Sequence, residues 1–192
     1  MLFSGMSALA QQVDIAFGVN ALTSPAASLS TSGQTLESIG GGTYVGFSGD
    51  YLFLFNRQFG VGSEVFWRAS RANYGISQPY RPLFYDFNAV WAPRLGPHVS
   101  PELVAGIGAE SLRFYTPFET CSFVSCTNYV SSNHFMGDFG GGLRMYVHGG
   151  LFIRPEVKLY LVRNNVEFSS NHATRYGVSI GYSFGRDNPS PF

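Results

Sequence analysis

The chain alternates apolar and polar residues with a period of two through most of its length. This alternation is typical of a β-strand that has one apolar and one polar face. Each alternating segment is about ten residues long, which is the length that a tilted strand needs to cross membrane hydrocarbon. Eight such segments occur, at residues 13–20, 45–55, 61–70, 83–91, 102–110, 135–147, 153–161 and 175–184. The sequence therefore predicts an all-β protein.

The connections between these segments alternate in length. Those after the second, fourth and sixth segments are short, around residues 56–58, 95–97 and 148–150. The others are long and rich in Ser, Thr, Asn and Gly, and they cover residues 21–39, 72–81, 116–133 and 164–171. Short periplasmic turns and longer extracellular loops are typical of an outer-membrane barrel. We therefore predict an eight-stranded antiparallel up-and-down transmembrane β-barrel.

The polar face of the segments carries charges of both signs, and Lys158 is the single lysine among 12 basic residues of the chain. Arginine suits paired, bidentate contacts in an enclosed site better than a solvated surface. An eight-stranded barrel is only wide enough for side chains to fill its lumen. We therefore expect the charges of the polar face to form an ion-paired plug inside the barrel. They are Asp14, Asp50, Glu64, Arg68, Asp86, Glu102, Glu110, Asp138, Arg144, Arg154, Glu156, Lys158 and Arg175.

The apolar face should then contact lipid, with Val157, Leu159 and Leu161 as its clearest run. Aromatic residues gather near both ends of the segments on this face, as in the interfacial belts of membrane proteins. The alternative is a soluble, lipocalin-like barrel in which the same apolar residues line the lumen and bind an apolar ligand. Pro155 interrupts the seventh segment and predicts a local bulge or bend, because proline cannot donate a ladder hydrogen bond.

Composition narrows the classes of protein further. The net charge is zero and only 12% of the residues are charged, so the sequence has no basic stripe for nucleic acid. No apolar stretch is long enough for a transmembrane helix. We expect residues 1–10 to be the remnant of a signal peptide or a disordered N-terminus, residues 11–184 the barrel, and residues 185–192 a C-terminal tail. Cys121 and Cys126 lie close together in the third long loop, where an oxidising compartment should join them in a disulfide.

The closing segment, Arg175-Tyr-Gly-Val-Ser-Ile-Gly-Tyr-Ser-Phe184, ends in an aromatic residue. It resembles the last strand of the small bacterial outer-membrane barrels of the OmpA and OmpX type, and the resemblance extends over about residues 13–184. It implies a location in the outer membrane among lipids and lipopolysaccharide. It also implies a structural or surface-interaction role through the long loops, with a partner that the sequence does not identify. The chain departs from the pattern in continuing past Phe184.

Some eight-stranded barrels modify lipid A, so an enzyme is a second hypothesis. Its candidate residues are Ser169, Ser170, Asn171, His172 and Thr174, where a histidine adjoins hydroxyl groups. No acidic residue stands where it would orient the imidazole, so no catalytic residue is assigned. The four histidines are scattered along the chain, and the sequence predicts neither a metal site nor a cofactor.

Four arginines stand at the surface-side ends of the segments with the parity of the lipid-facing residues: Arg71, Arg81, Arg113 and Arg163. The guanidinium fork binds phosphate oxygens bidentately, so we expect these residues to contact the phosphates of lipopolysaccharide. The alternative is that they are ordinary rim residues whose long side chains reach the interface.

Overall fold

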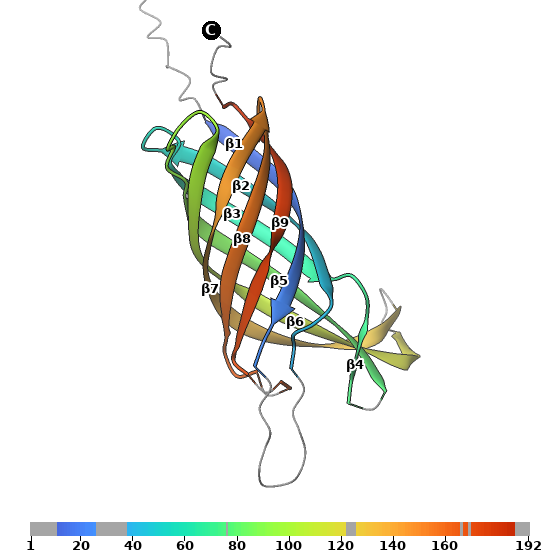
Figure 1. Cartoon of the computed structure of the whole chain (residues 1–192). Helices are drawn as coiled ribbons and strands as arrows, with labels where there is room; N and C mark the ends of the chain where they lie inside the picture. The colour runs from blue at the N-terminus through green and yellow to red at the C-terminus, as the bar shows by residue number, and fades with distance from the viewer. Residues whose placement is uncertain are drawn as a thin grey trace, which may run out of the picture.

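The computed structural model describes residues 11–25, 38–75, 77–121, 126–165, 167–168 and 170–186. This part of the chain is built from antiparallel strands (Figure 1). They are β1 (Gln12–Thr23), β2 (Thr43–Leu54), β3 (Phe59–Arg68), β4 (Ala72–Tyr74), β5 (Gln78–Trp91), β6 (Val99–Cys121), β7 (Cys126–His148), β8 (Leu151–Val162) and β9 (His172–Phe184). No helix in the described part is long and apolar enough to cross a membrane.

Eight of these strands close into a ring. The hydrogen-bonded order is β3-β2-β1-β9-β8-β7-β6-β5, and β3 pairs with β5 from Phe59↔Trp91 to Trp67↔Leu83, which joins the two ends. The short β4 pairs only with the start of β5 and forms a small hairpin on the long-loop side. The predicted eight-stranded barrel is therefore confirmed, with β4 as an addition to it.

The two faces of the sheet point as the charge pattern predicted. In β8 the exposed fractions of Val157 and Leu161 are 53% and 58%, whereas Arg154 and Lys158 are each 3% exposed. The same alternation recurs in β1 and β9. The apolar face thus covers the outside of the barrel, and the lipocalin-like alternative, which needs it inside, is wrong.

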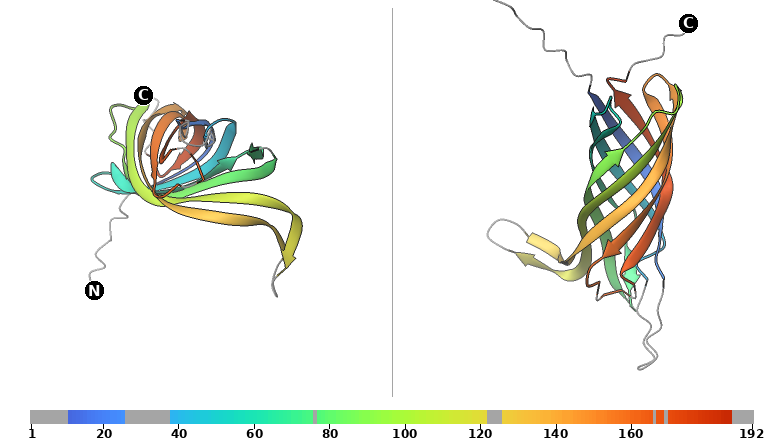
Figure 2. Two further views of the ribbon diagram at one scale, coloured as in Figure 1. Left: turned by 90° about the horizontal axis from the view of Figure 1, so that it is seen from below. Right: turned by 90° about the vertical axis from the view of Figure 1, so that its left-hand side faces the viewer.

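The third long loop was predicted over residues 116–133, and this prediction is wrong for residues 116–121 and 126–133, which are strands. Both β6 and β7 are 23 residues long and pair with each other as far as Cys121↔Cys126, with a register shift between Tyr115 and Thr120. Figure 2 shows that their distal part leaves the barrel as a ribbon that bends to one side. Its composition resembles that of a loop, but each strand supplies the hydrogen-bond partners of the other.

A bulge or a bend was predicted at Pro155, and the register excludes the bulge. The register of β7 with β8 is the same on both sides of this residue, from Gly142↔Glu156 to Met145↔Ile153. The strand β7 forms no bridge with Arg154 or Pro155, whereas β9 pairs with both. The missing N–H of proline therefore leaves a local gap in one ladder without displacing the strand.

The predicted disulfide joins Cys121 to Cys126 at the far end of the ribbon. It closes a ring with a sequence separation of only 5, and stabilisation from such a short ring is about 2 kcal/mol, confined to the ribbon. Replacing both cysteines with serine should leave the urea midpoint of the barrel unchanged, as followed by tryptophan fluorescence. Limited proteolysis should cut the ribbon of this variant faster. A lower urea midpoint would show that the ribbon and the barrel unfold together.

Candidate functional sites: a charged lumen and an arginine patch

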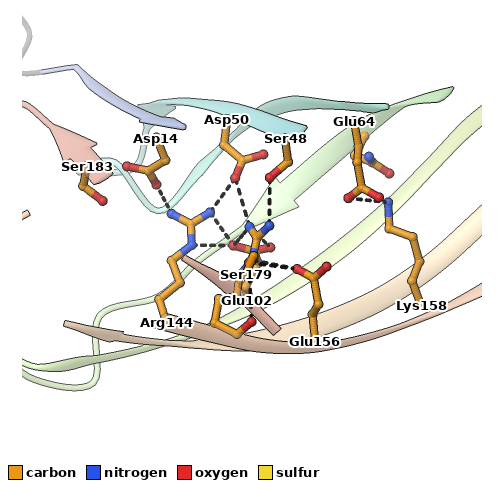
Figure 3. Close-up of polar contacts among 12 residues, drawn as sticks. Asp14, Ser48, Asp50, Glu64, Glu102, Arg144, Glu156, Lys158, Ser179 and Ser183 are labelled. Carbon is orange, nitrogen blue, oxygen red and sulfur yellow. Dashed lines mark hydrogen bonds and ion pairs between the residues drawn. The ribbon is translucent and has the colours of Figure 1, made fainter. Parts of the chain in front are cut away.

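The lumen contains a cluster of buried charges centred on Arg144 of β7. This fully buried guanidinium contacts carboxylates from three other strands: Asp14 of β1, Asp50 of β2 and Glu102 of β6 (Figure 3). Its distance to Asp50 is 2.9 Å. Because these strands lie on different sides of the ring, Arg144 ties the walls of the barrel together across its interior.

A second guanidinium, that of Arg154 on β8, shares two of these carboxylates. It lies 3.4 Å from Asp50 and 3.0 Å from Glu102, and it also contacts Glu156 at 2.9 Å. It donates hydrogen bonds to the hydroxyls of Ser48 and Ser179 at 2.9 and 3.1 Å. The fork of Arg154 therefore has an acceptor on every side, which is what a buried guanidinium requires.

Lys158 and Arg175 extend the cluster toward the long-loop end. The ammonium of Lys158 lies 3.1 Å from Asp86, 3.2 Å from Asp138 and 3.7 Å from Glu64. Arg175 contacts Glu64 and lies 3.0 Å from Glu156. Together the paired residues form the lumen network: Asp14, Asp50, Glu64, Asp86, Glu102, Asp138, Arg144, Arg154, Glu156, Lys158 and Arg175.

Two residues predicted for this network do not join it. Glu110 is fully buried inside the barrel, but its carboxylate has no hydrogen-bond partner in the described part of the chain. Arg68, at the end of β3, is half-buried beside Gly42 at the rim. Parity places both residues correctly on the inner face, but Glu110 lies opposite Phe84 and Arg68 opposite Tyr44, nearer the long-loop end of the barrel than the paired charges.

A layer of buried apolar side chains lies between the lumen network and the long-loop end of the barrel. The alternation pattern alone did not lead us to predict this layer. Phe66 and Phe84 stack with ring centroids 4.9 Å apart, and Tyr160 lies 5.6 Å from Phe66. The guanidinium of Arg175 lies 4.4 Å from the centroid of Phe66, which joins the two layers by a cation–π contact. We call this layer the aromatic cap: Leu22, Ile39, Tyr44, Phe66, Tyr80, Phe84, Leu112, Met136, Tyr160, Val162, Phe168 and Ala173. Its aromatic members share the parity of the charged residues, which is the signal that could have revealed it.

The short-turn end of the lumen is closed by a smaller set of contacts. Tyr146 and Phe152 pack edge to face at 5.7 Å, and the guanidinium of Arg186 lies 3.2 Å from the centroid of Tyr146. Partial burial lowers the pKa of Arg186 from its ordinary value. Gln12 donates to Asp14 at 3.0 Å and accepts from Arg94 at 3.2 Å. Polar contacts therefore continue from the network to this rim.

The residues of the enzyme hypothesis do not form a catalytic arrangement in the described part of the chain. Ser170 lies 3.1 Å from Nδ1 of His172, but no described carboxylate contacts this imidazole, and Thr174 accepts a hydrogen bond only through its carbonyl, from Thr23. Ser169 lies outside the described residues. The imidazole therefore lacks the third group that would orient it.

Another serine–histidine–carboxylate group lies at the long-loop end of the barrel. Nε2 of His134 lies 2.9 Å from Glu167 and 3.1 Å from the hydroxyl of Ser132, which donates to Glu167 at 2.6 Å. In a hydrolytic triad the acid and the serine contact opposite nitrogens of the imidazole. Here both contact the same nitrogen, so Glu167 competes with Ser132 for His134.

The described residues contain one close group of three possible metal ligands, Glu119, Cys121 and Cys126. The two cysteines are joined in the disulfide and therefore offer no thiolate.

On the outer wall, three of the four predicted arginines come together. Arg81 of β5 lies directly opposite Arg113 of β6 in the register. The guanidinium of Arg71 lies 3.7 Å above the ring of Tyr115, and that of Arg113 lies 5.1 Å from the ring centroid of Tyr129. These five residues form the arginine patch, in which no described carboxylate pairs with an arginine.

Arg163 does not belong to the arginine patch. It follows β8 and is exposed, and its amide donates to the carbonyl of Phe135 on β7. No described contact links its side chain to the other three arginines. The alternation along each strand therefore predicted correctly that the four arginines share the outer face. It did not predict which of them are neighbours.

Comparison with known proteins supports the fold and leaves the family open. No family model matches the chain, and no curated protein matches its sequence. Among solved structures, neisserial surface protein A matches with a TM-score of 0.64 at 10% identity, covering 91% of this chain and 97% of its own. The fold is that of the small outer-membrane β-barrels.

Two further outer-membrane barrels support this assignment of the fold. Ail of Yersinia pestis, in complex with the heparin analogue sucrose octasulfate, has a TM-score of 0.57 at 17% identity, covering 91% of this chain and 99% of its own. A major outer membrane protein of Thermus thermophilus has a TM-score of 0.53 at 12% identity, covering 88% of this chain and 99% of its own. At these identities the likeness concerns the fold alone.

Arg144 provides a direct test of the lumen network. Replacing it with methionine removes the cation that contacts Asp14 and leaves Asp50 and Glu102 to share Arg154 alone. Stranding buried partners in this way should lower the free energy of unfolding by about 3 to 5 kcal/mol, measured by urea titration in lipid vesicles. Arg163→Met, at an exposed arginine, is the matched control and should change it little. Equal midpoints for the two variants would contradict a stabilising role for Arg144.

Proposed function

We propose that this chain is a barrel of the bacterial outer membrane whose lumen is closed and which serves as a rigid scaffold for its surface segments. The observation that carries the proposal is the pairing of buried charges across the lumen. Seven carboxylates share four cations, so each cation contacts two or more carboxylates from different strands. Such charges are held in place and leave no free ionic path.

The space that remains inside the barrel supports a closed lumen. Two hollows among the described residues of the lumen network measure about 20 and 10 Å³. A cavity needs about 10 to 15 Å³ of accessible volume to hold a single water molecule. Isolated waters therefore fit beside Arg154 and Arg175, which line both hollows, and neither hollow is large enough for a continuous water column. The aromatic cap adds a second, apolar barrier above them.

The outer wall supports placement in a membrane. Ile15, Phe87, Phe139 and Ile180 are between 52% and 69% exposed, and they lie on four different strands around the ring. An apolar surface of this extent causes association in water but is satisfied by hydrocarbon. Aromatic residues mark the short-turn end of this face, where Phe59 and Trp91 stack at 5.9 Å. This arrangement matches the interfacial belts of membrane proteins.

The ribbon formed by the distal parts of β6 and β7 is the element best placed to meet a surface partner. It extends beyond the ring of paired strands and carries exposed apolar side chains, including Phe118 at 80% and Val130 at 66%. Binding commonly depends on segments that a rigid scaffold holds away from its core. We therefore assign the surface-interaction role to this ribbon.

A second function, contact with lipopolysaccharide, rests on the arginine patch. Two like charges directly opposite each other on a sheet are destabilising unless an anion lies between them. Arg81 and Arg113 are in this position, and Arg71 is held close by through Tyr115. The outer leaflet presents phosphate groups at this level, and the guanidinium fork binds them. The complex of Ail with a sulfated sugar analogue is a precedent within this fold for a polyanionic ligand.

Conductance measurements test the closed lumen. Purified protein inserted into planar bilayers should give no discrete single-channel openings, because the paired cations and the aromatic cap block the path. A general porin in the same bilayers serves as the positive control. Reproducible openings of one size would contradict the closed lumen and indicate a gated ion path through the lumen network.

Lipopolysaccharide binding tests the arginine patch. Replacing Arg71, Arg81 and Arg113 together with glutamine should weaken binding to detergent-solubilised protein at least about tenfold, since charge-assisted contacts each contribute more than 1 kcal/mol. Folding in neutral detergent should be nearly unchanged. Arg163→Gln is the matched control outside the patch. If the triple variant and the control bind lipopolysaccharide equally, the four arginines are rim residues only.

A further inference from the structure

The outer wall of the barrel carries a hollow where two small residues lie side by side. Gly49 of β2 pairs with Ser63 of β3, and both face outward between Ile15 of β1 and Phe87 of β5 in one row of the register. A hollow of about 590 Å³ opens here, and an adjoining one of about 400 Å³ shares Gly49, Ser63 and Phe87 with it. We call the two together the lipid-facing hollow.

Bulky side chains wall the hollow on both sides along the strands. Phe47, Val65 and Tyr85 form the neighbouring row toward the surface, and Tyr51 and Val61 belong to the row on the other side. The depression exists because glycine and serine stand where the adjacent rows carry large apolar residues. A Cβ at Gly49 would meet no other atom closer than 3.8 Å, so the space above it is open.

The strand β5 links this hollow to the arginine patch. Arg81 belongs to the patch and Phe87 lines the hollow, and the six residue-to-residue steps of extended strand from one to the other span about 20 Å. At the usual tilt of barrel strands this corresponds to about 15 Å along the membrane normal. Half of the hydrocarbon core is also about 15 Å thick. The hollow therefore lies at the depth that the acyl chains of outer-leaflet lipids reach when their headgroups lie beside Arg81.

We infer that the lipid-facing hollow holds an acyl chain of the lipopolysaccharide molecule whose phosphate contacts the arginine patch. This inference rests on the proposed contact with lipopolysaccharide and extends it to the acyl part of the ligand. The phosphate site and the hollow share β5, and apart from Ser63 the outward-facing side chains that line the hollow are apolar or aromatic. Protein and lipid are equally apolar in this layer, so selectivity comes from the fit of the chain between Phe47, Tyr51 and Phe87.

Filling the hollow tests the inference. The variant Gly49→Val/Ser63→Leu replaces the open space with side chains and should weaken binding of intact lipopolysaccharide about three- to tenfold through lost dispersion contacts. Binding of fully deacylated lipopolysaccharide, which retains the phosphates but has no chain, should not change. Arg81→Gln/Arg113→Gln should weaken the binding of both ligands.

The controls separate the two proposals. Gly137→Leu adds bulk to the outer wall on β7, two strands away from β5, where the space above the glycine is open, and this variant should bind both ligands like the parent chain. If the double glycine–serine variant folds poorly, as judged by heat-modifiable mobility, Ser63→Leu alone replaces it, since this side chain is already exposed. If the arginine variant binds lipopolysaccharide more weakly but the filled variant binds it normally, the proposed acyl-chain site is overturned and the phosphate contact stands. Normal binding by the arginine variant would overturn the phosphate contact itself.

The other molecule that could occupy the hollow is a second copy of the chain, and the oligomeric state of the protein in detergent tests this. The parent protein and the filled variant should both sediment as the same species in detergent. A parent dimer that becomes monomeric on filling, with lipopolysaccharide binding intact, would assign the hollow to protein contact and overturn the inference.

Discussion

The pairing of β3 with β5 is the constraint on which the rest of the structure depends. Within hydrocarbon every backbone N–H and C=O group must be paired in the protein, so a sheet that spans the membrane must have no free edge. The ladder from Phe59↔Trp91 to Trp67↔Leu83 removes that edge. Once the ring is closed, alternation along each strand divides the side chains into a lipid-facing set and an enclosed set, and each set meets a different solvent.

The enclosed set then faces a narrow space without bulk water. A charge placed there is stable only if it is paired and hydrogen-bonded. The guanidinium groups of Arg144 and Arg154 meet this requirement by sharing Asp50 and Glu102, which lie on strands separated in the ring. The aromatic cap fills the long-loop end of the lumen with apolar side chains, which are stable there without ionic partners. Charge pairing and ring packing therefore occupy successive layers of one interior.

The outer wall is less uniform than its apolar composition implies. Its surface-side rim has three arginines, two of which lie against tyrosine rings, and its middle has a hollow at Gly49 and Ser63. Both features lie on or beside β5, which joins the headgroup layer to the centre of the hydrocarbon. A lipid with several phosphates and several chains can contact both at once. One side of the barrel is thereby distinguished from the rest of the ring.

The sequence by itself determined the strands, the number that close the barrel and the direction of each face, because a period of two is a local property and the preference for arginine over lysine indicates an enclosed polar side. Tertiary structure decided which charges meet, since register and closure bring Asp14 and Arg144 together from distant parts of the chain. It also showed that residues 116–121 and 126–133 are strands and that Arg163 lies outside the arginine patch. The register of β2 with β3 places Gly49 directly opposite Ser63. These outcomes depend on pairing between distant segments, which alternation within one segment does not encode.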